Sequence, residues 1–173
     1  VYSLNSILPT DISILSAIPV IDTAHARYDV IERTYKYYII NYKNPFYGDY
    51  VWYINRDIDV EKMNNAASRI LNYNDFKCFC KKGSNNKTTI CNIKEAVCYK
   101  ENEYIIFSIT ADRFLRNMVR AIVGTIAEVG LGKITIDEFE NIIKYGDRSD
   151  AKTSAPASGL FLEKVIYPNN IFL

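Results

Sequence analysis

The 173-residue sequence contains no hydrophobic run close to the roughly 20 residues that a membrane-spanning helix needs. Its first residues contain neither the basic region nor the apolar region of a signal peptide. It also lacks a large excess of one charge, because the 21 lysines and arginines nearly equal the 20 aspartates and glutamates in number. This balance excludes a histone-like polycation. A local basic face can still bind nucleic acid. We therefore expect a cytoplasmic protein with no membrane partner.

Histidine is nearly absent, since His25 is the only one, and cysteine is scarce. The four cysteines are Cys78, Cys80, Cys91 and Cys98. They form no C-x-x-C pair, so their spacing disfavours a zinc site. A chain of this length does not need a disulfide framework to fold. We expect four reduced thiols and no metal site, and we find neither a Ser/His/Asp triad nor a phosphate-binding glycine loop.

The composition is that of an ordinary globular domain, with 49% hydrophobic and 24% charged residues. Aromatic residues reach 13%, which favours strands over an all-helical bundle. Alternating and β-branched segments predict strands over 12–18, 33–40, 90–99, 104–111 and 160–167, with a short candidate at 50–54. Helical spacing of apolar residues predicts helices over 60–71, 113–129 and 135–146. The pattern indicates an α+β fold, in which helices pack on one face of a mostly antiparallel mixed sheet.

The expected helix 113–129 has one face of polar and small residues. This face contains Arg113, Asn117, Arg120, Ala121 and Gly124. The face could simply be solvated, but glycine costs about 1 kcal/mol in a helix interior and is a poor choice there. Small residues let another backbone or a ligand approach closely, and an arginine among them can hold a carboxylate or phosphate.

A basic and aromatic segment precedes the strand expected over 33–40. It begins with His25-Ala26-Arg27-Tyr28 and continues with Arg33, Tyr35 and Tyr37, which share one face of a strand. Such faces suit unpaired bases, which stack on aromatic rings, although an ordinary half-buried strand would look the same. His25 has no visible carboxylate partner, which favours a structural role over that of a catalytic base. The small-residue loop 147–160 could place backbone near a site or merely connect two elements.

Three motifs, in the same order, resemble the C-terminal part of the tRNA pseudouridine synthase A family. The strongest runs from Phe107 to Gly124 and contains Phe-Leu-Arg-Asn-Met-Val-Arg-Ala-Ile-Val-Gly. The second is His25-Ala26-Arg27-Tyr28 followed by Arg33-Thr-Tyr-Lys-Tyr37, and the third is Ser154-Ala-Pro-Ala-Ser-Gly-Leu-Phe-Leu162. The opening Leu4-Asn5…Leu8-Pro9…Asp11-Ile12 and the stretch Asn74-Asp75-Phe76…Phe79 fit too, so matches run in order over nearly the whole chain. The resemblance implies a pseudouridine-synthase-like C-terminal domain.

The resemblance also implies an isomerase that converts uridine to pseudouridine at positions 38–40 of the tRNA anticodon stem-loop. It implies a homodimer, a tRNA partner and no metal or organic cofactor. By the same resemblance Arg120 pairs with a catalytic aspartate, and Tyr35 stacks on the target base and helps to remove its C5 proton. Leu160 would form the pocket wall, and His25, Arg27 and Arg33 would join Tyr35 and Leu160 in binding substrate.

One departure from the family is large. The family's catalytic aspartate lies in an Arg-Thr-Asp-x-Gly-Val-His-Ala motif, and this sequence contains none. The resemblance therefore suggests that residues 1–173 are one C-terminal domain of a longer two-domain protein, inactive by itself. Two alternatives remain open, a non-catalytic RNA-binding module of the same fold and a scaffold or dimerisation domain without RNA contact.

Overall fold

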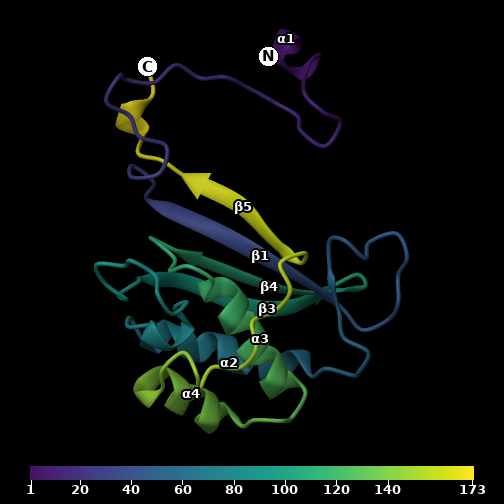
Figure 1. The fold of residues 1–173 in the computed structure, drawn as a ribbon. Coiled ribbons are helices and arrows are strands. Elements are labelled where there is room, and N and C mark those ends of the chain that lie inside the picture. Colours follow the sequence, from purple (N-terminus) through teal and green to yellow (C-terminus); the bar gives the residue numbers. More distant parts are fainter. The chain divides into compact units, whose positions relative to one another are not determined.

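The computed structural model describes all 173 residues and divides the chain into two compact units. The central unit comprises Glu32–Val165, and the terminal unit comprises Val1–Ile31 with Ile166–Leu173. The colours of Figure 1 show how the terminal unit brings together the first and last parts of the sequence. Each unit is described separately below.

The central unit is built on a mixed five-stranded sheet. Its strands are β1 (Glu32–Ile40), β2 (Trp52–Tyr53), β3 (Ile93–Glu101), β4 (Tyr104–Ala111) and β5 (Leu160–Ile166). The order is β2-β1-β4-β3, and β5 also pairs with β1. The β1–β4 and β3–β4 pairs are antiparallel, whereas β1 and β2 are parallel. The prediction of a mostly antiparallel mixed sheet is confirmed.

Alternation along β1 determines which side chains enter the core. Tyr37 and Ile39 are fully buried, while Lys36 and Tyr38 point to the other face and are half-buried. Tyr37 lies opposite Phe107 of β4, so two aromatic residues from paired strands share the core face.

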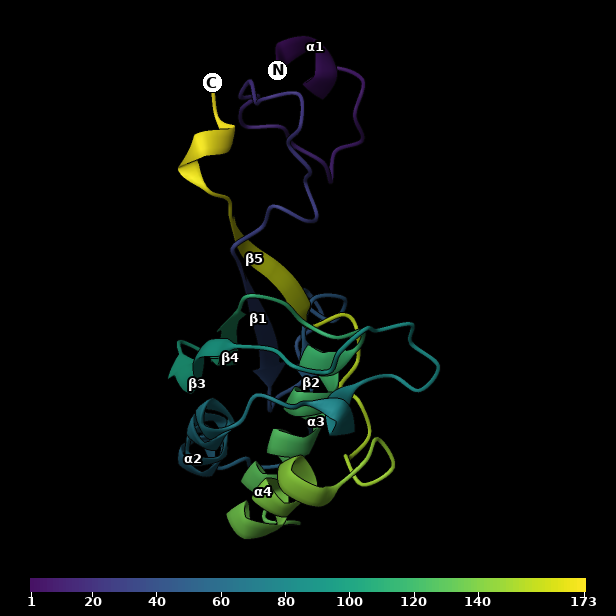
Figure 2. The same ribbon diagram turned by 90° about the vertical axis from the view of Figure 1, so that its left-hand side faces the viewer.

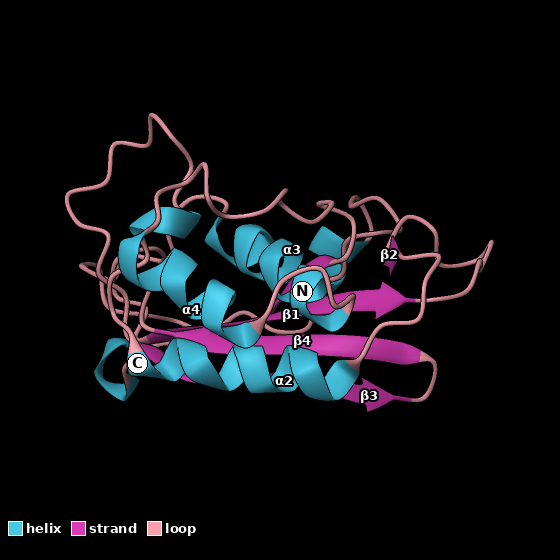
Figure 3. Cartoon of the chain, turned by 90° about the horizontal axis from the view of Figure 1, so that it is seen from below, coloured by secondary structure: helices cyan, strands magenta, loops and turns pink.

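Three helices cover one face of this sheet, as predicted (Figures 2 and 3). They are α2 (Val60–Arg69), α3 (Met118–Gly130) and α4 (Ile136–Tyr145), while the four-residue α1 (Tyr2–Asn5) belongs to the terminal unit. Short 3₁₀ turns occupy 70–72, 77–79 and 169–171. Almost every residue of α3 is buried, so this helix lies in the centre of the core. None of the helices is long and apolar enough to cross a lipid bilayer.

The predicted start of the long helix at Arg113 is wrong, because α3 begins only at Met118. Asn117 adopts a left-handed conformation with φ of 67°, which a continuing helix cannot contain. Upstream, the Asp112 carboxylate accepts hydrogen bonds from the backbone N–H groups of Arg113 (2.6 Å) and Asn92 (2.9 Å). These bonds hold the chain after β4 in a tight turn, and the helix starts after it.

The predicted strand over 12–18 is also wrong, since no strand forms there. A strand needs a neighbouring strand to satisfy its backbone groups. Instead, the backbone N–H and carbonyl of Ile14 bond to the side-chain amide of Asn5, each at 2.8 Å. An isolated β-bridge of the terminal unit joins Val20 to Phe172, beyond the predicted strand. The other predicted strands and helices are confirmed, with ends displaced by a few residues.

Helix α4 opens with a complete capping box. Thr135 Oγ1 accepts from the Glu138 backbone N–H (3.1 Å), and Glu138 Oε2 accepts from the Thr135 backbone N–H (2.7 Å). We expect Thr135→Ala to lower the free energy of unfolding by about 1 kcal/mol, because a cap is lost. Urea unfolding measures this, with Thr10→Ala as the control at an exposed threonine. Equal midpoints for the two variants would contradict the stabilising role of this cap.

Candidate active site

A cavity of about 330 Å³ lies where β1, the start of α3 and the start of β5 meet in the central unit. It brings together Tyr35, Arg120 and Leu160, which the sequence places far apart. The other lining residues are Lys81, Phe114, Leu115, Arg116, Asn117, Met118 and Val119. Three of the residues that resemblance assigned to the reaction therefore line a single cavity.

Arg120 is held in place by the chain that follows α4. Its Nε donates a hydrogen bond to the Ala155 carbonyl oxygen (2.7 Å), and its own carbonyl oxygen accepts from the Ala155 N–H (3.0 Å). No hydrogen bond within the chain uses the terminal Nη nitrogens of Arg120. A half-buried guanidinium with free terminal nitrogens can form a bidentate ion pair with a carboxylate.

The small residues of α3 explain how this contact is possible. Ala121 and Gly124 are buried, so the face is not a solvated one. A Cβ atom at Gly124 would lie 2.0 Å from the Thr153 carbonyl oxygen and 3.1 Å from the Ala155 nitrogen. Only glycine therefore lets the segment 153–155 run directly against the helix. The sequence prediction that this face admits another backbone is confirmed.

Hydrogen bonds hold the loop 147–160 in place on both sides of its contact with α3. Ser154 Oγ accepts hydrogen bonds from Asn117 Nδ2 (2.6 Å) and Arg148 Nη2 (2.8 Å). Tyr37 Oη donates to the Pro156 carbonyl oxygen (2.7 Å). Burial raises the pKa of Tyr37 far above its usual value, and the nearby Arg120 charge only partly opposes this, so the phenol remains a donor. Arg148 has no signal in the sequence, because nothing in its spacing shows that the loop folds back on itself.

The apolar part of the cavity combines aromatic and aliphatic side chains. Tyr35 is half-buried and meets Phe114 edge to face, with ring centroids 5.2 Å apart and an interplanar angle of 88°. Leu160 supplies an aliphatic wall. An aromatic ring beside aliphatic and cationic groups suits a planar base that carries a charged backbone.

The other predicted substrate-binding residues lie elsewhere. Arg33 does not line the cavity, and its Nη1 donates to the Asp112 carbonyl oxygen (3.0 Å). His25 and Arg27 belong to the terminal unit. The Nδ1 atom of His25 accepts hydrogen bonds from the backbone N–H groups of Arg27 (3.1 Å) and Tyr28 (3.3 Å), so the imidazole stabilises the turn that contains it. A substrate-binding role for these three residues stays a prediction.

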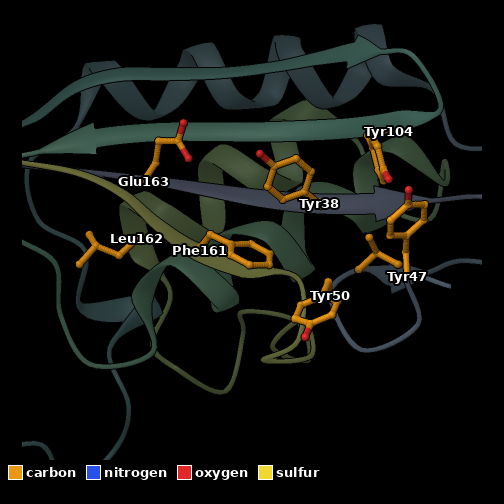
Figure 4. A pocket seen from close by; sticks show the side chains of 8 residues that line it. Tyr38, Tyr47, Tyr50, Tyr104, Phe161, Leu162 and Glu163 are labelled. Carbon is orange, nitrogen blue, oxygen red and sulfur yellow. The ribbon is translucent and has the colours of Figure 1, made fainter. Parts of the chain in front are cut away.

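A second cavity, of about 380 Å³, lies on the sheet face that the helices leave uncovered (Figure 4). The Tyr38 ring lies nearly perpendicular to Tyr104 and Phe161, at centroid distances of 5.8 and 5.4 Å. Tyr47, Tyr50, Val51, Leu162 and Glu163 complete the lining. Alternation along β1 could have indicated Tyr38, but its partners come from a long loop and from other strands, so no sequence pattern indicates the cavity.

Three of the four cysteines are buried. All four are free, and burial raises the pKa of Cys78 to about 12, of Cys91 to about 11 and of Cys98 to about 12. Protonated buried thiols are poor nucleophiles and poor metal ligands. No group of three or more histidine, cysteine, aspartate or glutamate side chains in the chain could hold a metal ion.

Comparison with known proteins agrees with this geometry. A family model described as tRNA pseudouridine synthase matches residues 66–168, which is more than half of the chain. The chain belongs to the tRNA pseudouridine synthase family. The matched region of this pseudouridine synthase chain runs from α2 through β5 and includes Arg120 and Leu160.

Relatives in the pseudouridine synthase family extend the match to nearly the whole chain. The tRNA pseudouridine synthase A of Bacteroides fragilis is 50% identical over 98% of this chain and 68% of its own length. That of Parabacteroides distasonis is 47% identical over 98% of this chain and 67% of its own length. That of Thermoanaerobacter pseudethanolicus is 42% identical over 96% of this chain and 69% of its own length. About a third of each relative therefore has no counterpart in these 173 residues.

Proposed function

We propose that the protein isomerises uridine to pseudouridine in tRNA, at positions 38–40 of the anticodon stem-loop, in the cytoplasm. The observation that carries this proposal is the meeting of Tyr35, Arg120 and Leu160 in one cavity of a pseudouridine synthase chain. Each of these residues comes from a different element, yet each supplies what the reaction needs. These needs are an aromatic surface for the base, a cation for the nucleophile and an apolar wall.

In the proposed reaction, an aspartate starts the chemistry and the base detaches from C1′, rotates and rejoins through C5. The Nη nitrogens of Arg120 would pair with that aspartate, and such a pair lowers a carboxyl pKa and keeps the nucleophile ionised. Tyr35 would stack on the uracil and help to remove the C5 proton, while Leu160 closes the pocket. The target nucleotide must leave the base stack to enter a cavity of this kind.

No lining residue of the cavity is an aspartate or a glutamate. The sequence also contains no Arg-Thr-Asp-x-Gly-Val-His-Ala motif. We therefore propose that polypeptide outside these 173 residues supplies the nucleophile, and that residues 1–173 are one C-terminal domain. The relatives' additional length supports this. We call the protein with that added part the full-length protein, and we propose that it acts as a homodimer that binds tRNA across both subunits.

The proposal is tested by incubating tRNA with the 173-residue chain and, in parallel, with the full-length protein. We expect pseudouridine in the tRNA only with the full-length protein, because the chain alone lacks a nucleophile. Mass spectrometry of digested tRNA with cyanoethylation of pseudouridine detects the product. Pseudouridine formed by the chain alone would contradict the proposed source of the aspartate.

Two other results would favour the alternatives. A full-length protein that binds tRNA without modifying it would be an RNA-binding module of the same fold. A protein without salt-dependent tRNA affinity would be a scaffold, because phosphate contacts weaken as salt rises.

A further inference from the structure

We infer that Lys81 and Arg116 form a phosphate-binding subsite at the cavity that contains Tyr35, where they hold the backbone of the RNA whose base enters the pocket. This inference rests on the proposed function, since it names how the same site holds its substrate. Neither residue was assigned a role by the motifs that identify Tyr35, Arg120 and Leu160.

The charge of the cavity favours an anionic ligand. Three of its lining residues are cations, namely Lys81, Arg116 and Arg120, and none is an acid. The chain forms four salt bridges elsewhere, with Lys36, Lys62, Lys94 and Lys133, but neither Lys81 nor Arg116 takes part in any of them. Three like charges around one cavity favour an anion. One carboxylate on Arg120 would leave the other two cations without a partner.

A backbone hydrogen bond brings the two cations together. The backbone N–H of Lys81 donates to the Arg116 carbonyl oxygen (3.1 Å), which joins the loop after the 77–79 turn to the residue before Asn117. Two side chains distant in sequence therefore leave the backbone at adjoining points. Both are exposed, so they can reach a ligand without a costly opening of the core.

The chemistry of the two side chains suits a phosphate. A guanidinium donates paired hydrogen bonds to phosphate oxygens, and an ammonium adds a compact charge that adapts to the remaining oxygens. RNA brings a phosphate with every nucleotide, so a base stacked on Tyr35 carries a phosphate near the cavity mouth. The expected ligand is therefore a phosphodiester of single-stranded or distorted RNA, and the expected contact is independent of base identity.

The sequence supplies a matched control in Lys82, which follows Lys81 and is also exposed but does not line the cavity. Hydrogen bonds from Ser149 lower the pKa of Asp147, and the charge of Lys82 lowers it further. Lys82 thus lies near a carboxylate, whereas Lys81 does not contact one.

The experiment measures binding of an anticodon stem-loop RNA to the full-length protein at several KCl concentrations. We expect Lys81→Gln and Arg116→Gln each to reduce the slope of log affinity against log salt by about 0.7 to 0.9, one phosphate contact each. Arg116→Lys should keep the slope, because the charge remains, and Lys82→Gln should leave it unchanged. The kinetic effect should appear in KM more than in kcat, because the contact positions the backbone rather than the reacting atoms.

Circular dichroism would confirm that the variants fold like the wild type, so that the slopes can be compared. Unchanged slopes in Lys81→Gln and Arg116→Gln would overturn the subsite, as would an equal loss in Lys82→Gln. Such results would leave the proposed function intact if the wild type still forms pseudouridine. A wild type that neither binds the RNA nor modifies it would overturn the proposed function itself.

Discussion

Replacing Arg120 by alanine is expected to abolish pseudouridine formation by the full-length protein while tRNA binding survives. Its Nε is fixed on Ala155, so the guanidinium is already placed for its partner. Without it, the proposed aspartate would be a buried charge without a partner, which costs roughly 3–5 kcal/mol. The aspartate would protonate instead, and a loss of this size corresponds to a rate reduced by about 100-fold or more.

Single-turnover assays with enzyme in excess measure this loss apart from tRNA affinity. Arg56→Ala is a suitable control, since Arg56 is exposed and does not line the cavity. We expect Arg120→Lys to recover little activity, because an ammonium cannot bond to Ala155 and the carboxylate in the same way. Near-normal turnover of Arg120→Ala would refute the role proposed for this arginine.

The second large effect is expected at Gly124. A methyl group there would lie 2.0 Å from the Thr153 carbonyl oxygen, which is a backbone atom and cannot move aside as a flexible side chain could. Gly124→Ala should therefore force the helix and the segment 153–155 apart and cost about 3 kcal/mol, the upper range for overpacking. For a chain of this size the melting temperature should fall by roughly 6–12 °C.

Differential scanning calorimetry measures this change, with Gly48→Ala as the control. A Cβ at Gly48 would approach no atom closer than 4.0 Å. Activity of the full-length Gly124→Ala variant should also fall at temperatures where the protein is folded, because Ala155 would shift with its carbonyl. If the two variants melt alike, the close approach between α3 and this segment is not a constraint on the fold.

Sequence patterns predict the helices and strands whose formation depends mainly on residues within the element. The hairpin of β3 and β4 and the helices α2 and α4 follow from alternation, helical spacing and the Thr135 cap. The start of α3 was missed because it depends on a left-handed Asn117 and on the Asp112 carboxylate, which bonds to residues of two loops. A strand over 12–18 was expected from composition, but composition cannot supply a neighbouring strand.

The site likewise contains residues that a motif identifies and residues that only the folded structure brings together. Family resemblance identified Tyr35, Arg120 and Leu160, and the structure places them in one cavity. Lys81 is one of several lysines in a polar loop that suits RNA binding, and no motif distinguishes it from Lys82, while Arg148 lies in a connecting loop. The contact of Lys81 with Arg116 joins two separate loops, and that of Arg148 with Ser154 folds one loop back on itself, so no periodicity in the sequence reports either.

The segment from Ala155 to Leu160 acts as a single spacer for the whole site. It anchors Arg120 at one end, ends in the apolar wall at the other, and is tied to Tyr37 of β1 through Pro156. Tyr35 lies on the same face of that strand. One short segment thus carries both the contact that orients the cation and the apolar wall. A residue inserted there would displace one of these two contacts, so this loop has far less freedom to vary in length than an ordinary surface connection.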